Sequence, residues 1–226
     1  MKTTRTYRGP FAERPFFSSR EIETICNDAL REVDLFPIHP EAVRIDRFIE
    51  KKFKITLCYE QLPEGVLGLT RFSRKGVESI VVSILLDGPS DKVTERRLRS
   101  TLAHEAGHGL MHTYLFATSS ENNGLFGDFS EPASPKVLCR DKAYKGQWWE
   151  YQANQAIGAL LMPYSLVNIA LEPFMLKSSL GCQQFDFSRE EKAVLELTKI
   201  FDVNGAVARI RISELLRSDS GGQLML

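Results

Sequence analysis

One short stretch, His104-Glu105-Ala106-Gly107-His108, constrains this chain more than any other feature of its sequence. Histidines four positions apart on an α-helix lie one turn apart on nearly the same face, so both can hold one cation. Glu105 lies next to that face, where its carboxylate can accept a proton from a water molecule that the metal activates. Apolar residues recur every four positions around the stretch, which predicts a helix that begins near Asp91 or Thr94.

The helix that carries the two histidines lacks a third ligand of its own. A catalytic zinc ion takes three protein ligands and leaves one position for water. The metzincin pattern needs a glycine at 111 and a histidine at 114, where this chain has Met111 and Tyr114. The helix between His104 and His112 spans roughly 12 Å, so one cation cannot reach both. We therefore expect His112 to support the site from a neighbouring position or to lie in the core, and His39, beside two prolines, to lie at the surface.

A second helix, predicted from Trp148 to Met162 and stopped by Pro163, carries the best candidate for the third ligand. Glu150 on this helix completes a His₂Glu donor set of the kind that binds catalytic zinc. Asn154 lies one turn later, where it can accept a hydrogen bond from the outer nitrogen of a ligand histidine. The alternative is that Glu150 is a solvated acid. Its aromatic neighbours favour burial, and a buried carboxylate needs a partner.

Upstream of the histidines, the sequence predicts two helices and then three short strands. Ser18 and Glu21 form a capping-box pattern before a first helix, and a second helix is predicted from about Glu41 to Lys52. Residues 55–59, 66–72 and 77–86 are rich in β-branched and apolar residues and are separated by turns, which predicts an antiparallel meander. A short antiparallel sheet leading into such a helix is typical of a zincin-like core, where an edge strand binds substrate as an added strand. A generic α+β core is the alternative.

Residues 117–146, between the two site helices, lose periodicity and gain Ser, Asn, Gly and Pro. A long irregular segment directly after a candidate active-site helix favours a cleft wall or lid, and disorder is the other common explanation. The residue that stabilises an oxyanion is left open among four tyrosines: Tyr114, Tyr144, Tyr151 and Tyr164.

Two blocks of the chain, in this order, resemble the ImmA/IrrE metallopeptidases. The first runs from Arg99 to His108, with Leu110 and His112 after it. The second is Glu150-Tyr151-Gln152-Ala153-Asn154, followed by a segment from Ala159 to Pro163. Together with the preceding helices and strands, the resemblance covers roughly residues 20–165.

The resemblance implies one catalytic Zn²⁺ ion held by His104, His108 and Glu150, with Glu105 as the catalytic base. Asn154 and His112 would support the ligands from behind. Members of the family are bacterial or phage regulators that often cleave a repressor, so the implied function is a zinc-dependent endopeptidase acting on a helix-turn-helix repressor. The alternative is a non-enzymatic module that binds DNA or a transcription factor through its C-terminal helices. Glu105 favours the enzyme, because a structural zinc has no need of it.

The last part of the chain predicts a helix from about Ser188, a turn at residues 202–205 and a second helix to Arg217. This pair resembles a helix-turn-helix, but residues 181–217 carry six basic and six acidic side chains. Because a DNA-binding face needs an excess of Lys or Arg, we expect a structural or partner-docking role. The expected organisation is a solvated arm (1–17), a zincin-like domain (18–170), a helical region (171–217) and a mobile tail (218–226).

The composition of the chain bears on its binding partners and its location in the cell. Lys plus Arg and Asp plus Glu both number 29, so a chain with no net charge is not expected to bind nucleic acid or a membrane surface as a whole. No segment approaches the roughly 20 apolar residues of a membrane span, and the N-terminus lacks the apolar stretch of a signal peptide. The four cysteines form no C-x-x-C pair, which favours reduced thiols and a cytoplasmic location. The oligomeric state has no signature in the sequence.

Overall fold

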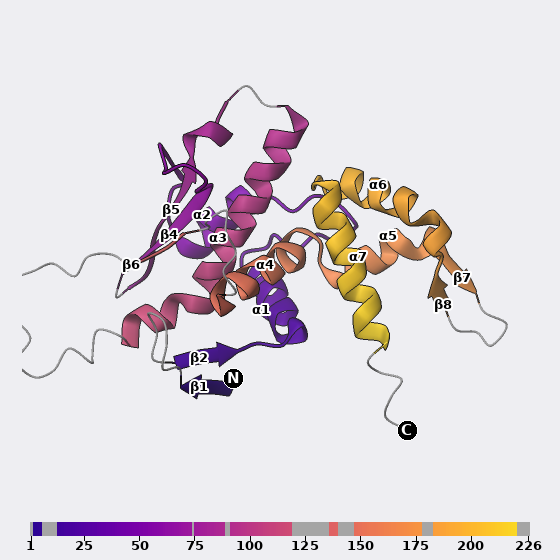
Figure 1. The fold of residues 1–226 in the computed structure, drawn as a ribbon, viewed down its shortest axis with the longest axis horizontal. Helices are drawn as coiled ribbons and strands as arrows, with labels where there is room; N and C mark the ends of the chain where they lie inside the picture. Colours follow the sequence, from indigo (N-terminus) through magenta and orange to yellow (C-terminus); the bar gives the residue numbers. More distant parts are fainter. Residues whose placement is uncertain are drawn as a thin grey trace, which may run out of the picture.

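The computed structural model describes residues 2–5, 13–73, 75–88, 91–118, 136–139, 147–177 and 183–220. Within these residues the chain is a mixed α+β protein, mostly helical, with three small sheets. The predicted α+β class is therefore confirmed. Figure 1 shows strands β4, β5 and β6 toward one end of the molecule, the long helix α3 (Lys92–Thr118) beside them, and helices α5, α6 and α7 toward the other end.

The first helix begins where the sequence predicts. In α1 (Ser19–Glu32) the Ser18 hydroxyl accepts a hydrogen bond from the Glu21 amide at 3.3 Å, and the Glu21 carboxylate accepts one from the Ser18 amide at 2.8 Å. This reciprocal pair satisfies amides that have no partner inside the helix. Helix α2 (Ile45–Phe53) begins four residues later than predicted. The residues before it, 41–44, are not helical; among them, Val43 buries its side chain in the core and its carbonyl accepts a hydrogen bond from α3.

The central sheet has the strand order β3-β5-β4-β6. Strands β4 (Gly68–Ser73) and β5 (Gly76–Ser83) form an antiparallel hairpin, and Gly76 at its turn has a φ of 124° that favours glycine. Strand β3 (Cys58–Glu60) pairs in parallel with β5 instead of lying beside β4. The predicted meander is therefore wrong. Apolar runs identify strands, but the partner of each strand depends on contacts far along the chain.

The outer edge of β4 is covered by β6 (Lys136–Cys139), which pairs with it in antiparallel register. Leu138 lies opposite Thr70 in this pairing. Strand β6 comes from the segment predicted as a cleft wall or lid; the parts of that segment at 119–135 and 140–146 lie outside the described residues. This edge of β4 is thus paired with the chain itself; the sequence does not indicate which edge strand would bind substrate.

Helix α4 (Trp148–Leu161) packs closely on α3. A Cβ atom at Gly107 would come within 2.7 Å of the Ala156 Cβ, so only glycine allows this distance between the helices. Glycine therefore has a packing reason inside a helix that it otherwise weakens by about 1 kcal/mol. Pro163 ends α4 as predicted, and α5 (Tyr164–Leu171), which was not predicted, follows at once.

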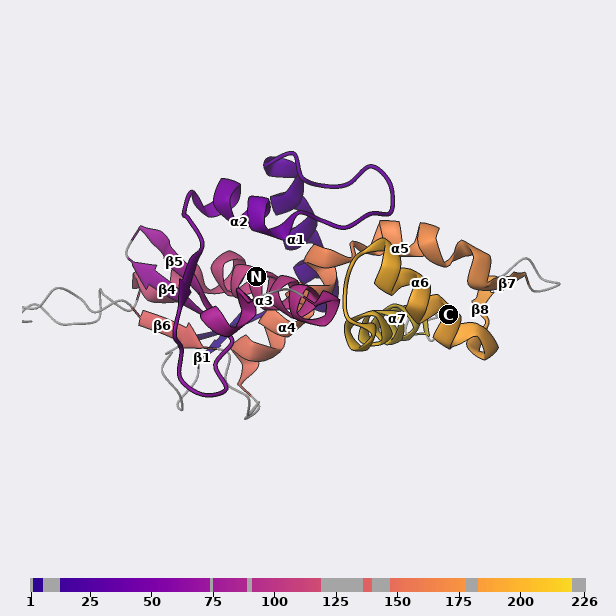
Figure 2. The same cartoon turned by 90° about the horizontal axis from the view of Figure 1, so that it is seen from above.

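The C-terminal part contains a hairpin of β7 (Met175–Lys177) and β8 (Gln183–Phe185), then α6 (Glu190–Ile200) and α7 (Gly205–Ser220). Two helices joined by a turn are present as predicted, although α7 continues past residue 217; the resemblance of this pair to a helix-turn-helix motif stays a prediction. Buried residues of α6 and α7 belong to the same hydrophobic core as those of α1 and α3. Figure 2 shows α5, α6 and α7 grouped at the end of the molecule away from the sheet. The division at residue 170 remains a prediction.

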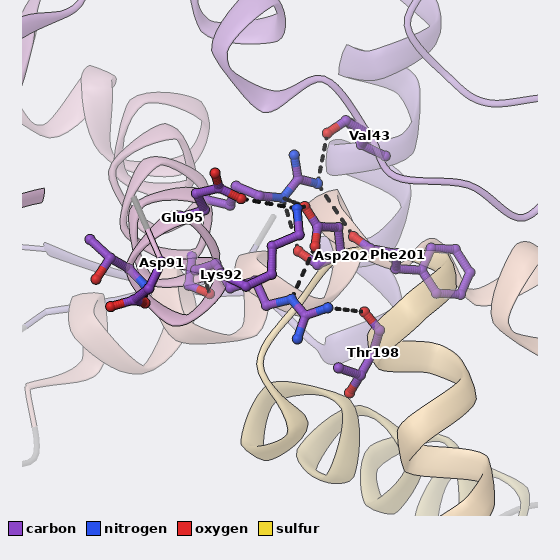
Figure 3. A network of polar contacts seen from close by, with 11 residues as sticks. Val43, Asp91, Lys92, Glu95, Thr198, Phe201 and Asp202 are labelled. Atoms are coloured by element: carbon purple, nitrogen blue, oxygen red, sulfur yellow. Dashed lines mark hydrogen bonds and ion pairs between the residues drawn. The ribbon is translucent and has the colours of Figure 1, made fainter. Parts of the chain in front are cut away.

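Cations at the start of α3 hold the turn between α6 and α7, as Figure 3 shows. The Asp202 carboxylate accepts hydrogen bonds from Arg96 Nε at 3.0 Å and Lys92 Nζ at 3.4 Å, and its backbone is left-handed with a φ of 51°. Arg99 donates at 3.0, 3.0 and 3.3 Å to the main-chain oxygens of Asp202, Val43 and Phe201. We call Lys92, Arg96, Arg99 and Asp202 the Asp202 clamp.

Two arginines of α7 are also committed to contacts within the chain. Arg209 donates to Glu191 through both terminal nitrogens, at 2.8 and 3.0 Å. Arg211 is buried, and donates to Glu23 of α1 at 2.6 Å and to the Met162 carbonyl at 3.0 Å. These contacts attach α7 to the rest of the protein and neutralise the charges of Arg209 and Arg211.

The N-terminal segment is more structured than the predicted solvated arm. Strands β1 (Lys2–Arg5) and β2 (Glu13–Phe16) pair as an antiparallel ladder. Residues 3–5 are exposed, as expected of an arm, but Pro15 is buried and accepts a hydrogen bond from α4. Arg14 and Phe16 are exposed as well, so the structure departs from a solvated arm only at Pro15 and in the pairing of the two strands.

In the described part of the chain, no helix taken singly combines the length and the apolar character needed to cross a membrane. The segments Trp148–Leu161 and Tyr164–Phe174 meet those limits only when they are joined, and they are bent by 57° relative to each other.

Candidate metal centre

Three of the predicted site residues lie together in the interior. His104 and His108 are fully buried, and Glu150 is 6% exposed. The Nε2 atoms of the two histidines are 3.1 Å apart. Glu150 Oε2 lies 3.1 Å from His104 Nε2, and Glu150 Oε1 lies 3.4 Å from His108 Nε2. One ligand atom from each residue falls within a group whose members are all within 4.8 Å of one another.

The two helices bring this group together as helical geometry requires. The histidines are four apart on α3, and Glu150 lies in the first turn of α4, which crosses α3 at the Gly107–Ala156 contact. A larger residue at 107 would push α4, and Glu150 with it, away from the histidines. The close packing of the two helices therefore sets the size of the site.

Asn154 makes the contact predicted for it. His104 Nδ1 lies 3.1 Å from Asn154 Oδ1. Because an amide oxygen only accepts, Nδ1 carries the ring hydrogen of a neutral His104. The other nitrogen, Nε2, then presents a lone pair to His108 and Glu150.

His112 lies outside the ligand group, as the length of the helix requires. It is fully buried, with its Nδ1 3.0 Å from His108 Nδ1 and its ring edge-on to Trp148. Burial, and then the neighbouring His108, lower the pKa of His112 to about 3. The imidazole is therefore neutral at ordinary pH and carries one hydrogen.

Glu150 is charged in spite of its burial. Burial alone raises its pKa, but hydrogen bonds and charge interactions with His104 and His108 outweigh that effect when these imidazoles carry protons, and lower the pKa to about 2; a metal ion would supply the positive charge in place of those protons. Its Oε1 atom has no hydrogen-bond partner among the described residues. A buried carboxylate oxygen of this kind needs a cation or a donor nearby.

The donor set fits a metal ion. Two imidazole nitrogens with lone pairs and a carboxylate face one another at 3.1 to 3.4 Å, an arrangement that is repulsive without a positive charge among them. Imidazole and carboxylate ligands suit several divalent ions, so the geometry alone does not select one metal. The buried His104, His108 and Glu150 group can hold a metal ion.

Glu105 lies beside this group without joining it. It is fully buried, and the Thr70 hydroxyl of β4 lies 2.8 Å from its Oε2 and 3.1 Å from its main-chain oxygen. A Cβ atom at Gly68 would come within 2.7 Å of Thr101 Cγ2 and 2.9 Å of Glu105 Oε1. Strand β4 therefore approaches the Glu105 carboxylate closely, and Gly68 permits that approach.

Sequence reasoning missed several residues around the site: Pro15, Gly68, Thr70 and Gln152. A glycine at the start of a strand can signal a close approach of the backbone, and Gly68 carried that signal. Pro15 and Thr70 reach the site from strands whose position no local pattern reveals, whereas Gln152 lies on α4 between Glu150 and Asn154 and was overlooked there.

The remaining candidates are only partly placed. Tyr114 packs against the cluster of Phe72, Leu115 and Phe116, Tyr151 is half exposed, and Tyr164 packs on the main core. Tyr144 lies outside the described residues. These positions do not single out one tyrosine for an oxyanion. His39 is exposed, as predicted.

Comparison with known proteins adds no family assignment. A search of protein-family models finds no match for this chain, and no curated protein matches it. The resemblance of the two sequence blocks to ImmA/IrrE metallopeptidases stays a prediction.

Proposed function

We propose that this protein is a cytoplasmic, zinc-dependent endopeptidase with a zincin-like core, and that it cleaves a regulatory protein of the helix-turn-helix repressor type. One observation carries the proposal. The buried His104, His108 and Glu150 group lies beside a fully buried glutamate, Glu105, that does not belong to it. A metal site that only stabilises a fold has no use for that glutamate.

The donor set supports zinc. His₂Glu is a ligand combination of catalytic zinc sites, and both histidines offer a lone pair at Nε2. When bound, zinc supplies a Lewis acid that lowers the pKa of water toward 7 and polarises a peptide carbonyl. The resemblance to ImmA/IrrE metallopeptidases assigns the same three ligands.

Glu105 is the proposed general base. Its carboxylate accepts a proton from the attacking water and then passes it to the nitrogen of the leaving amine. The Thr70 hydroxyl at 2.8 Å from Oε2 holds the carboxylate in one orientation, and Gly68 lies on the side of Oε1. Because both neighbours belong to β4, the strand determines where the base points.

Strand β4 also supports an extended peptide as the substrate. Its outer edge pairs with β6 in antiparallel register, and the paired residues include Thr70, which contacts Glu105. A peptide added to this edge would therefore lie next to the base, with its main chain held by strand pairing. Such a peptide would have to replace β6.

The test is to change Glu105 to Gln, which keeps the size and polarity of the side chain but cannot accept the proton. The substrate for the assay is a helix-turn-helix repressor encoded beside this protein, because many members of the resembled family are encoded beside their targets. Its cleavage should fall by about 10²–10⁴-fold, the usual scale for loss of a general base. Zinc content should stay the same, because Glu105 is not a ligand. The matched control is Glu95→Gln, an exchange of the same kind near the start of α3, which should cleave normally.

Two results would reject the proposal. Equal cleavage by the wild type and Glu105→Gln would remove Glu105 from the mechanism. Failure of the zinc-loaded wild type to cleave any co-encoded protein would favour the non-enzymatic regulatory module instead.

A further inference from the structure

We infer that a buried chain of hydrogen bonds, from His108 through His112 and Gln152 to the Pro15 carbonyl, fixes the orientation and tautomer of His108. In this inference, which rests on the proposed metal site, His112 and Gln152 are positioning residues. The N-terminal hairpin of β1 and β2 becomes part of the support of the metal centre.

The Pro15 carbonyl, at the end of this series of hydrogen bonds, determines which group donates in each bond. Gln152 is 3% exposed, and its Nε2 atom donates to the Pro15 carbonyl at 2.9 Å. A carbonyl only accepts, so the amide must turn its NH₂ group toward Pro15 and its oxygen the other way. That oxygen, Oε1, lies 3.0 Å from His112 Nε2.

The donor and acceptor of each hydrogen bond can then be assigned for both histidines. Because Gln152 Oε1 only accepts, His112 Nε2 must carry a hydrogen, and an imidazole with one hydrogen then has its lone pair on Nδ1. His112 Nδ1 lies 3.0 Å from His108 Nδ1, so His108 must donate there. His108 Nε2 is left with a lone pair, which faces His104 and Glu150. Each bond in the chain determines the next one.

The two ligand histidines are thus supported differently. At its outer nitrogen, Nδ1, His104 lies against Asn154, an exposed residue where water can take the place of this contact. The support of His108 is buried along its whole length and ends on a main-chain carbonyl, which cannot rotate away. A residue 137 positions before Gln152 therefore contributes to the binding of the metal.

The experiment measures zinc affinity of the full-length protein by competition with a chromogenic chelator, so it needs no substrate. His112→Phe keeps an aromatic ring against Trp148 and removes the acceptor for His108. Gln152→Leu keeps the volume and removes both amide contacts. Each should weaken zinc binding about 10- to 100-fold, the usual effect of losing such a support. The double variant should be little weaker than the worse single variant, because both interrupt one chain.

Gln152→Glu separates positioning from simple packing. A glutamate still accepts from His112 Nε2, but cannot donate to the Pro15 carbonyl. Positioning therefore predicts tighter zinc binding by Gln152→Glu than by Gln152→Leu, while the metal-free glutamate variant unfolds more easily because it buries a charge. If Gln152 served only to pack the interior, the variant that is less stable without metal would also bind zinc more weakly. Cobalt substitution adds a spectroscopic check, since the absorption bands report the coordination of the ion.

Ser100→Ala is the control. Ser100 is 6% exposed and one turn before His104, but its hydroxyl bonds only to the Arg96 carbonyl of the same helix among the contacts recorded for it. This variant should bind zinc as the wild type does. Wild-type affinity in both His112→Phe and Gln152→Leu would overturn the inference and leave the proposed peptidase intact. A wild-type protein that binds no zinc would overturn the inference and the proposed function together.

Discussion

Helix α3 carries two polar networks whose chemistry is opposite. In the Asp202 clamp, at the start of the helix, cationic donors meet a carboxylate and main-chain carbonyls at 3.0 to 3.4 Å. In the His104, His108 and Glu150 group, further along the helix, lone pairs meet lone pairs at similar distances. The metal group is buried, and the clamp is partly buried. The difference teaches that a metal site is recognised by acceptors facing acceptors, and not by the burial of polar groups alone.

The physical consequence is that, among the described residues, the clamp pairs donors with acceptors, whereas the metal group sets acceptors against one another. In the clamp, the side chains of Lys92, Arg96 and Arg99 donate hydrogen bonds to a carboxylate and to main-chain carbonyls, so the clamp stabilises the fold without a bound ion. The metal group is complete only when a cation neutralises the facing acceptors. Metal binding to such a group contributes directly to the free energy of folding.

The largest expected effect follows from removing a ligand. His108→Ala or Glu150→Ala should reduce bound zinc from about one ion per chain to nearly none. Zinc at 1,000 times its dissociation constant should stabilise the wild type by about 4 kcal/mol and should not stabilise these variants. Elemental analysis and thermal unfolding with and without zinc measure both effects.

A variant of the clamp is the natural comparison for that experiment. Asp202→Asn should bind zinc normally and should gain the same stabilisation from it. If both ligand variants retained a full ion, the three residues would not be the metal site, and the contrast between the two networks would disappear.

A smaller effect is expected when the clamp itself is changed. Asparagine tolerates the left-handed backbone of Asp202 but removes its charge, so Asp202→Asn should lower the free energy of unfolding by about 1 kcal/mol. The loss is modest because the carboxylate is partly exposed and water screens the ion pairs. Urea unfolding with an unchanged slope would measure it.

The clamp also predicts a pH dependence. Partial burial raises the pKa of Asp202, but the hydrogen bond from Arg96 and the charge of Lys92 outweigh this, so the pKa falls below its ordinary 3.8. A lowered folded pKa means that the stabilisation is present above about 3.8 and is lost as the pH falls below it. Asp202→Asn should therefore differ from the wild type at pH 6 and approach it in strong acid. An equal difference at all pH values would show that the charge of Asp202 does not matter.

The metal group could be predicted from the sequence because its information is local. A spacing of four positions on one helix brings the histidines together, and a glutamate between tryptophan and tyrosine on a later helix is expected to be buried. The partners of these residues were less accessible. Asn154 was found because it lies one turn from Glu150, whereas Thr70 and Pro15 come from strands whose pairing no local rule gives.

The same division explains the errors in the fold. The cap of α1 and the stop at Pro163 depend on adjacent residues, and both were predicted. The parallel pairing of β3 with β5 depends on distant segments, and the predicted meander is wrong. The role of Arg99 was also not predicted. Arg99 belongs to the first sequence block that resembles the metallopeptidases, but it donates hydrogen bonds to the turn before α7.

The smallest expected effect concerns α7, where positive charge is matched within the chain as it is in the clamp. Arg209 pairs with Glu191, and the guanidinium lowers the pKa of that carboxyl. Arg211 is buried against Glu23. Because Arg209 and Arg211 are already paired, they offer little charge to phosphates, so the protein should show no salt-sensitive binding to operator DNA from a neighbouring operon. Glu191→Gln frees Arg209 and should at most add weak, non-specific binding that vanishes as salt is raised. Fluorescence anisotropy at two salt concentrations measures DNA binding by the wild type and by Glu191→Gln.

A tight, sequence-specific complex of the wild type that is lost in Arg209→Ala would show that α7 binds DNA specifically. Paired charge would then no longer distinguish structural networks from functional ones.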